Sequence, residues 1–292
     1  MIPNLIHFPA NPTLKGQAEL IPDVPYSKNG QTLTLILPWA PNGDRTKAGR
    51  IPLIVFVQGS GWTSPNLNYE LPMLCHYAEE GIAVATVRHR STADGNVFPA
   101  FLIDVKCAIR FLRSHAEEYG IDPSRVAAFG TSSGGNTVCL LGLTGDDPAY
   151  KSDEYPEESD AVCCVVSCFA PTDLAARFAA RRKDQDWYRG MMTERFGPDS
   201  SQWDQQLREF SPACRVVAGK KYPPFLLLHG SGDTLVPYSQ METLYEALQT
   251  ADTEVKAVCV DGGEHEGNFW GPEVRAMIHK ELIERLSGPL FS

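Results

Sequence analysis

Short, continuous apolar runs alternate along this chain with longer segments of helical periodicity, and this alternation limits the possible folds more than any other feature. Pro52–Val57 (PLIVFV) and Ile82–Val87 are two of the apolar runs, and Phe101–Tyr119 repeats apolar residues at helical spacing. A strand that is apolar on both faces must be covered on both, as the strands of parallel sheets are. Repeated strand and helix units therefore predict an α/β fold with a mostly parallel sheet and helices on both faces.

Other segments extend this pattern in both directions. Gln31–Leu37 alternates polar and apolar residues as a half-buried strand does, so we expect the sheet to begin mixed before it becomes parallel. Gly120 ends the helix that precedes it, and a new helix is expected to start around Ser132. The remaining expected strands are Arg125–Phe129, Ala161–Phe169, Pro224–Leu228 and Glu254–Val260, and the remaining expected helices are Tyr69–Glu80, Tyr238–Thr250 and Pro272–Leu286.

One long insertion interrupts the alternation of strands and helices. Residues 174–214 are rich in Arg, Gln, Trp and Met, have helical spacing, and lie between two expected core strands. We interpret them as a small helical cap over the carboxyl edge of the sheet. The prediction is one domain over residues 1–292 with this cap inserted.

Charge and hydropathy exclude several classes of partner. With 36 acidic and 26 basic side chains the formal charge is −10, which repels phosphate backbones, so no nucleic acid is expected. No segment reaches the ~18 apolar residues of a membrane span. The first 16 residues lack the apolar run of a signal peptide, so we expect a cytoplasmic protein without a membrane partner. Most of the eight cysteines lie in apolar runs without paired ligands nearby, so no structural metal is expected. No organic cofactor is expected either.

The sequence FGTSSGG (residues 129–135) places a Gly-x-Ser-x-Gly pattern between a short strand and a helix. In this context the pattern is a nucleophile elbow, a turn so tight that a Cβ two residues before or after the serine would collide with backbone. The alternative frame, with Ser133 as nucleophile, has Thr131 where the first glycine belongs. Ser132 is therefore the predicted nucleophile.

A serine hydroxyl needs a histidine base and a carboxylate that orients the histidine. Asp233 follows a buried strand in the segment LLLHGSGD, and His265 lies in a glycine-rich loop after the last expected strand. The resulting order Ser, Asp, His is the order expected with this elbow. We predict Asp233 as the acid and His265 as the base, with Asp261 as the alternative acid and His229 as a structural group.

Acyl transfer also requires N–H donors for the oxyanion of the tetrahedral intermediate. The loop QGSGW (residues 58–62) directly follows the strand Pro52–Val57 and can supply two such donors. The N–H of Ser133 can supply another.

Together these motifs resemble the α/β-hydrolase fold, which implies a sheet of the eight-stranded type, and more closely the branch of hormone-sensitive-lipase-like and feruloyl or acetyl carbohydrate esterases. The resemblance runs from Pro52 to Leu286 and rests also on DVKCAIRFLR (residues 104–113), YGIDP (119–123) and HGSGD followed by VP (229–237). It implies a serine carboxylesterase that uses an acyl-enzyme, with oxyanion donors at Ser60, Gly61 and Ser133. Gln58 and Ser60 stand where that branch usually has histidine and glycine, and Ser133 stands where alanine is common.

The resemblance further implies a small acyl group, acetyl or feruloyl, on a small-molecule ester such as an acylated sugar. Trp62 and Trp187 are the predicted substrate-binding side chains, since their rings can stack on a sugar or an aryl group. Two alternatives stay open at this point: an amide-cleaving hydrolase, such as a formamidase or small peptidase, and a receptor that keeps the fold without the chemistry.

Overall fold

A single mixed sheet organises the computed structural model, which describes residues 2–45, 50–179 and 182–287. Within these residues the sheet has eight strands in the order β1-β2-β4-β3-β5-β6-β7-β8. Strand β2 pairs antiparallel with both β1 and β4, and the other neighbouring strands pair parallel, so the sheet begins mixed and becomes parallel, as predicted. The strands are β1 (Ala18–Pro25), β2 (Thr32–Pro38), β3 (Ile51–Val57), β4 (Ala83–Val87), β5 (Ile121–Thr131), β6 (Cys164–Cys168), β7 (Phe225–Gly230) and β8 (Val255–Val260).

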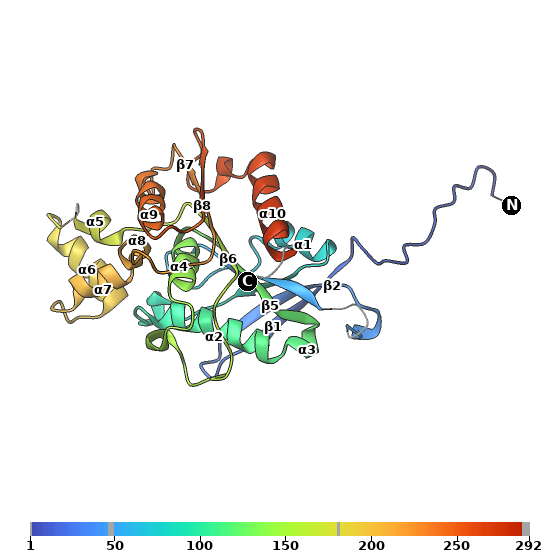
Figure 1. The fold of residues 1–292 in the computed structure, drawn as a ribbon, viewed down its shortest axis with the longest axis horizontal. Coiled ribbons are helices and arrows are strands. Elements are labelled where there is room, and N and C mark those ends of the chain that lie inside the picture. The colour runs from blue at the N-terminus through green and yellow to red at the C-terminus, as the bar shows by residue number, and fades with distance from the viewer. Residues whose placement is uncertain (1, 46–49, 180–181, 288–292) are drawn as a thin grey trace.

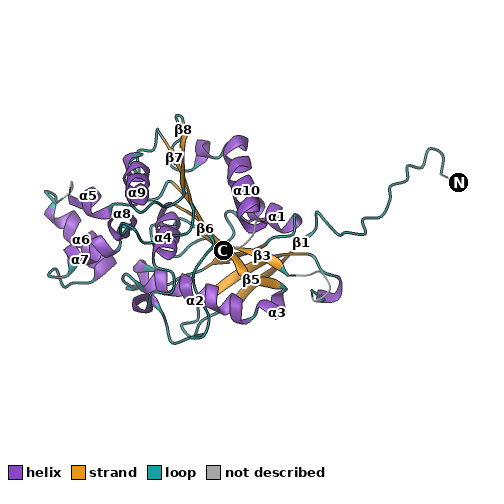
Figure 2. Ribbon diagram, in the orientation of Figure 1, coloured by secondary structure: helices purple, strands orange, loops and turns teal. Residues whose placement is uncertain are grey.

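Helices cover both faces of this sheet (Figure 2). Because side chains alternate along a strand, β3 points Val55 toward one helical layer and Phe56 toward the other. The first layer contains α2, α4 and α9, and the second contains α1 and α10. The helices outside the insertion are α1 (Leu71–Glu79), α2 (Ala100–Ser114), α3 (Ala116–Tyr119), α4 (Ser132–Leu143), α9 (Ser239–Thr250) and α10 (Pro272–Ser287), with short 3₁₀ turns at Pro41–Gly43, Thr92–Asp94, Pro148–Tyr150 and Gly267–Phe269.

The predicted fold class is confirmed, with differences at the ends of elements. Strand β1 was not predicted because it is an irregular edge strand whose residues are mostly exposed or half-buried, so it carries no clear alternation. Strand β5 begins at Ile121 rather than Arg125, and the predicted helix over Phe101–Tyr119 is divided into α2 and α3 at His115.

Four helices occupy the predicted insertion: α5 (Leu174–Ala179), α6 (Gln185–Phe196), α7 (Trp203–Glu209) and α8 (Pro212–Arg215). They gather at the end of the molecule opposite the N-terminus (Figure 1). Their buried side chains, among them Met192 and Leu207, join the same apolar cluster as α2. Residues 180 and 181 of the insertion lie outside the described residues.

A buried ionic network explains part of the DVKCAIRFLR motif. Lys106 and Arg110 lie one turn apart on α2, and both form ion pairs with Asp160, at 2.5 and 3.0 Å. All three side chains are fully buried. Lys106 Nζ also donates to the Thr144 carbonyl at 2.6 Å, and Asp160 accepts from the Asp146 N–H at 2.9 Å. The network therefore ties α2 to the end of α4 and to the loop that leads into β6.

Candidate active site

The nucleophile elbow lies at the junction of β5 and α4. Ser132 has a φ of +50°, a strained value for a residue with a side chain. A Cβ on Gly134 would lie 2.0 Å from the Val57 carbonyl oxygen, and a Cβ on Gly130 would lie 2.5 Å from the Gly134 oxygen. Both positions therefore require glycine, which is the reason the sequence pattern predicted the turn.

Three side chains from distant segments form one hydrogen-bonded chain. Ser132 Oγ lies 2.9 Å from His265 Nε2, and His265 Nδ1 lies 2.7 Å from Asp233 Oδ2. The other oxygen of Asp233 accepts the N–H groups of Leu235 and Val236, at 2.9 and 2.8 Å. Because these bonds fix the carboxylate, it can hold the imidazole with Nε2 facing the serine, as a general base requires.

The surroundings of the imidazole restrict its motion. The Phe169 ring lies against His265 edge to face, with centroids 4.7 Å apart. His229 Nε2 lies 2.9 Å from the Val236 carbonyl oxygen and 3.3 Å from Asp233, and burial lowers the pKa of this histidine. Burial therefore favours the neutral form of His229, whose contacts with Val236 and Asp233 are those expected of a structural group beside the Asp233 loop. The alternative acid Asp261 lies instead against the Cys259 thiol.

The loop at residues 58–62 lies against the elbow, and Gly61 and Ser133 both line the cavity next to Ser132. Ser60 differs from its predicted role as an oxyanion donor. Its N–H donates to Ser133 Oγ at 2.8 Å, so it already has an acceptor within the protein. The structure therefore leaves the N–H groups of Gly61 and Ser133 as the predicted donors at the cavity.

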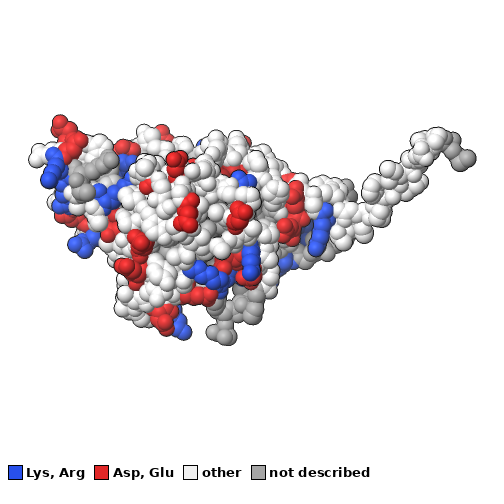
Figure 3. Space-filling model, turned by 90° about the horizontal axis from the view of Figure 1, so that it is seen from above, with Lys and Arg blue, Asp and Glu red and all other residues white. Residues whose placement is uncertain are grey.

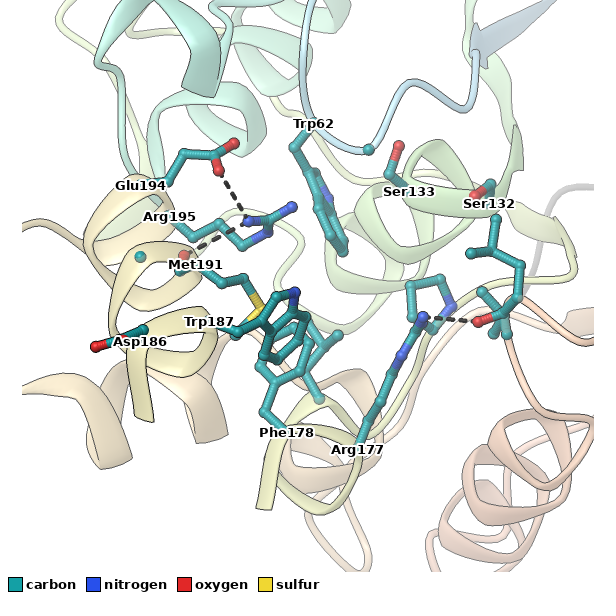
Figure 4. A pocket seen from close by; sticks show the side chains of 16 residues that line it. Trp62, Ser132, Ser133, Arg177, Phe178, Asp186, Trp187, Met191, Glu194 and Arg195 are labelled. Carbon is teal, nitrogen blue, oxygen red and sulfur yellow. Dashed lines mark hydrogen bonds and ion pairs between the residues drawn. The ribbon is translucent and has the colours of Figure 1, made fainter. Parts of the chain in front are cut away.

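A cavity of about 550 Å³ extends from Ser132 toward helices α5 and α6 (Figure 4). Trp187 lines it with 37% of its surface exposed, whereas Trp62 is only 5% exposed and packs on Phe210, with ring centroids 4.7 Å apart. Trp62 therefore forms part of the cavity wall, and little of its ring is free to stack on a substrate as predicted. Helices α5 and α6 and the loop after β7 contribute apolar side chains and a set of charged ones, namely Leu174, Phe178, Met191, Leu235, Arg177, Asp186, Glu194 and Arg195.

Residues 42–248 match the BD-FAE family. The chain belongs to this family. Its fold is therefore the α/β-hydrolase fold that the elbow and the order of the three side chains predicted.

Several known proteins similar to this BD-FAE member are named as esterases. "Esterase LipC" of Mycobacterium tuberculosis is 29% identical over 77% of this chain and 57% of its own. An esterase of Thermogutta terrifontis solved with butyrate bound is 26% identical, with a TM-score of 0.71 over 93% of this chain and 95% of its own. A truncated carbohydrate esterase from gut microbiota shares the fold at 22% identity, with a TM-score of 0.74 over 95% and 99% of the two chains. The chain spans between half and two thirds of the first curated relatives that it matches.

Several side chains at this BD-FAE site were not predicted from the sequence. Thr131 Oγ1 accepts the Gly59 N–H at 2.9 Å, Phe169 packs on the base, and the charged side chains come from the cap. Thr131 lies inside the elbow motif, but its hydrogen-bond partner Gly59 is 72 residues away in the sequence. The spacing of residues in the motif therefore did not indicate this contact. The cap residues carried only a helical periodicity.

Glu70 is a further unpredicted residue behind the loop at residues 58–62. It is 7% exposed, and Gln58 on that loop hydrogen bonds to it. Burial, reinforced by the charge of Glu266, raises the pKa of Glu70 to about 8. The native protein therefore holds a neutral carboxyl here at neutral pH.

We expect this carboxyl to make stability depend on pH. Between pH 4.5 and about 8 the unfolded chain loses a proton that native Glu70 retains, so the free energy of unfolding falls as pH rises through this window. Urea unfolding at intervals from pH 5 to 8 measures the slope, which the Glu70→Gln variant should flatten. The exposed Glu117→Gln variant on α3 serves as the control. Equal slopes for Glu70→Gln and the wild type would contradict the prediction.

Proposed function

We propose that this protein is a serine carboxylesterase that hydrolyses small acyl esters through an acyl-enzyme on Ser132. His265 takes the Ser132 proton as Oγ attacks the ester carbonyl, and the N–H groups of Gly61 and Ser133 bind the oxyanion. His265 then gives the proton to the departing alcohol. In the second half of the cycle it takes a proton from the water that attacks the acyl-enzyme, and it returns this proton to Ser132 Oγ as the acid is released.

The observation that carries this proposal is the continuous contact from Ser132 Oγ through His265 to Asp233, at 2.9 and 2.7 Å. The separation of Ser132 and His265 already lies within hydrogen-bond reach, so proton transfer needs no rearrangement. The esterase names of the relatives agree with this chemistry.

We further propose an acetyl or feruloyl group on a carbohydrate as the substrate, and the helices at 174–215 as a cap on a single domain that encloses the sugar. The cavity combines an exposed tryptophan with charged side chains, a mixture suited to stacking on a sugar ring and binding its hydroxyl groups. Acidic and basic side chains are also mixed on the outer surface at this end of the molecule (Figure 3).

A fluorophosphonate probe tests the reaction, because it forms a covalent adduct only with an activated nucleophile. We expect labelling of Ser132, located by mass spectrometry, together with turnover of p-nitrophenyl acetate that exceeds turnover of aminoacyl p-nitroanilides. An unlabelled Ser132 would favour the receptor, and turnover of anilides alone would favour an amidase. A screen of acetylated and feruloylated oligosaccharides then tests the substrate class.

A further inference from the structure

The two residues on either side of the nucleophile are both hydrogen bonded to the loop at residues 58–62. Thr131 Oγ1 accepts the Gly59 N–H at 2.9 Å, and Ser133 Oγ accepts the Ser60 N–H at 2.8 Å. Thr131 is fully buried and Ser133 is 2% exposed, so water does not compete for these bonds. Two consecutive N–H groups of the loop are thus attached to the elbow itself.

The loop has little freedom beyond these two bonds. A Cβ on Gly59 would lie 2.7 Å from the Ser132 Cβ, which shows how closely the loop backbone approaches the nucleophile. Ser60 Oγ donates to the Thr63 carbonyl at 2.8 Å, and Thr63 Oγ1 donates to the Ser60 carbonyl at 2.6 Å. The position of the next residue, Gly61, is therefore determined by how the loop is attached at Gly59 and Ser60.

This arrangement has a direct consequence for oxyanion binding. The Gly59 and Ser60 N–H groups are both engaged with the elbow, whereas Gly61 lines the cavity, so its N–H is the candidate donor that follows them in this loop. Its φ of +62° is one that a residue with a side chain rarely adopts. A donor stabilises a transition state only if it is held at the place where charge develops.

We propose that Thr131 and Ser133 are positioning residues that hold the Gly61 N–H in the oxyanion site. This inference rests on the proposed esterase function, since it concerns the transition state of that reaction. The two hydroxyl groups contact the loop rather than the ester, so their loss is expected to affect the transition state and leave binding of the ground state nearly unchanged.

Thr131→Val keeps the shape of the side chain and removes the acceptor of the Gly59 N–H. We expect kcat for p-nitrophenyl acetate to fall about 10- to 100-fold, because displacement of a catalytic group by about 1 Å has effects of this size. We expect KM to change less than about twofold. The inhibition constant of a trifluoromethyl ketone, whose adduct places an oxyanion in the same site, should rise in parallel with the loss of kcat. Thr131→Ser retains the hydroxyl and should restore kcat to within about threefold of the wild type.

Thr137→Val is the matched control, on α4, the helix that begins directly after Thr131. The Thr137 hydroxyl is equally buried but donates to the Ser133 carbonyl within α4, away from the loop. It should leave kcat within about twofold of the wild type. If Thr131→Val does not fold, Ser133→Ala and Thr131→Ser decide the question. A Ser133→Ala enzyme with wild-type kcat overturns the proposal. A Thr137→Val enzyme that loses as much kcat as the variants at Thr131 and Ser133 overturns it as well.

Hydrogen exchange separates this inference from the proposed function. The Gly59 amide should exchange faster in Thr131→Val and the Ser60 amide faster in Ser133→Ala, whether or not the protein hydrolyses esters. The wild type could prove inactive and unlabelled while these variants still show faster exchange. That result would support the attachment of the loop and contradict the proposed esterase function. Unchanged exchange in both variants, in an active enzyme, would overturn the attachment alone.

Discussion

Replacing Asp233 by asparagine is expected to lower kcat for ester hydrolysis about ten-thousand-fold, the size of effect that follows loss of the orienting carboxylate in a Ser-His-Asp triad. The new side chain can still accept the N–H groups of Leu235 and Val236 through its amide oxygen, so the loop should keep its shape. Its amide nitrogen then faces His265 Nδ1, which must act as an acceptor. The ring proton moves to Nε2, and the base can no longer accept the Ser132 proton.

Asp261→Asn provides the control for this prediction, since Asp261 is the other carboxylate that follows a late strand of the sheet. It contacts the Cys259 thiol rather than the imidazole, so kcat should stay within about twofold of the wild type. Both variants should be assayed with p-nitrophenyl acetate, with thermal unfolding as a check of folding. An Asp233→Asn enzyme within tenfold of the wild type, or an equal loss in Asp261→Asn, would show that the triad is assigned to the wrong acid.

The proposed reacting groups could be predicted from the sequence because each follows a strand of a parallel sheet. Carboxyl ends of parallel strands meet at one edge, so Ser132 after β5, Asp233 after β7 and His265 after β8 had to come together once the strands were recognised. Gly130 carried an equally local signal, since a Cβ there would meet the backbone of Gly134. A Cβ on Gly134 would instead meet the Val57 carbonyl oxygen on β3, so this glycine was predictable only as part of the elbow pattern. These parts of the site follow from order along the chain.

Other parts of the site depend on contacts that the order of the chain does not encode. Ser60 was predicted to face the oxyanion, but the Ser133 hydroxyl accepts its N–H, and only the fold brings these residues together. Trp62 and Trp187 were both predicted to bind substrate, and both line the cavity. Their exposure differs greatly, because Trp62 packs into the aromatic core around Phe210. Burial of Glu70 behind the loop likewise has no sequence signature.

The DVKCAIRFLR motif belongs to stability rather than to the reacting groups, and replacing Asp160 by asparagine tests this. The change leaves Lys106 and Arg110 buried without the carboxylate that compensates both charges. Breaking a buried ion pair by removing one partner costs about 3–5 kcal/mol, because the remaining charge stays without compensation. We expect a loss of this size in the free energy of unfolding, measured by urea denaturation, with the slope of the transition unchanged.

Asp153→Asn separates burial from charge, since Asp153 also pairs with a lysine but at the surface, where the two side chains are 86% and 73% exposed. Solvent screens that pair, so the urea midpoint should not shift measurably.

The network at Asp160 joins α2 to the end of α4, whose first residue is Ser132, so it supports the elbow only through the helix. Asp160→Asn should therefore keep its kcat at temperatures where it remains folded. A stable Asp160→Asn protein with reduced kcat would instead place the network in the catalytic machinery.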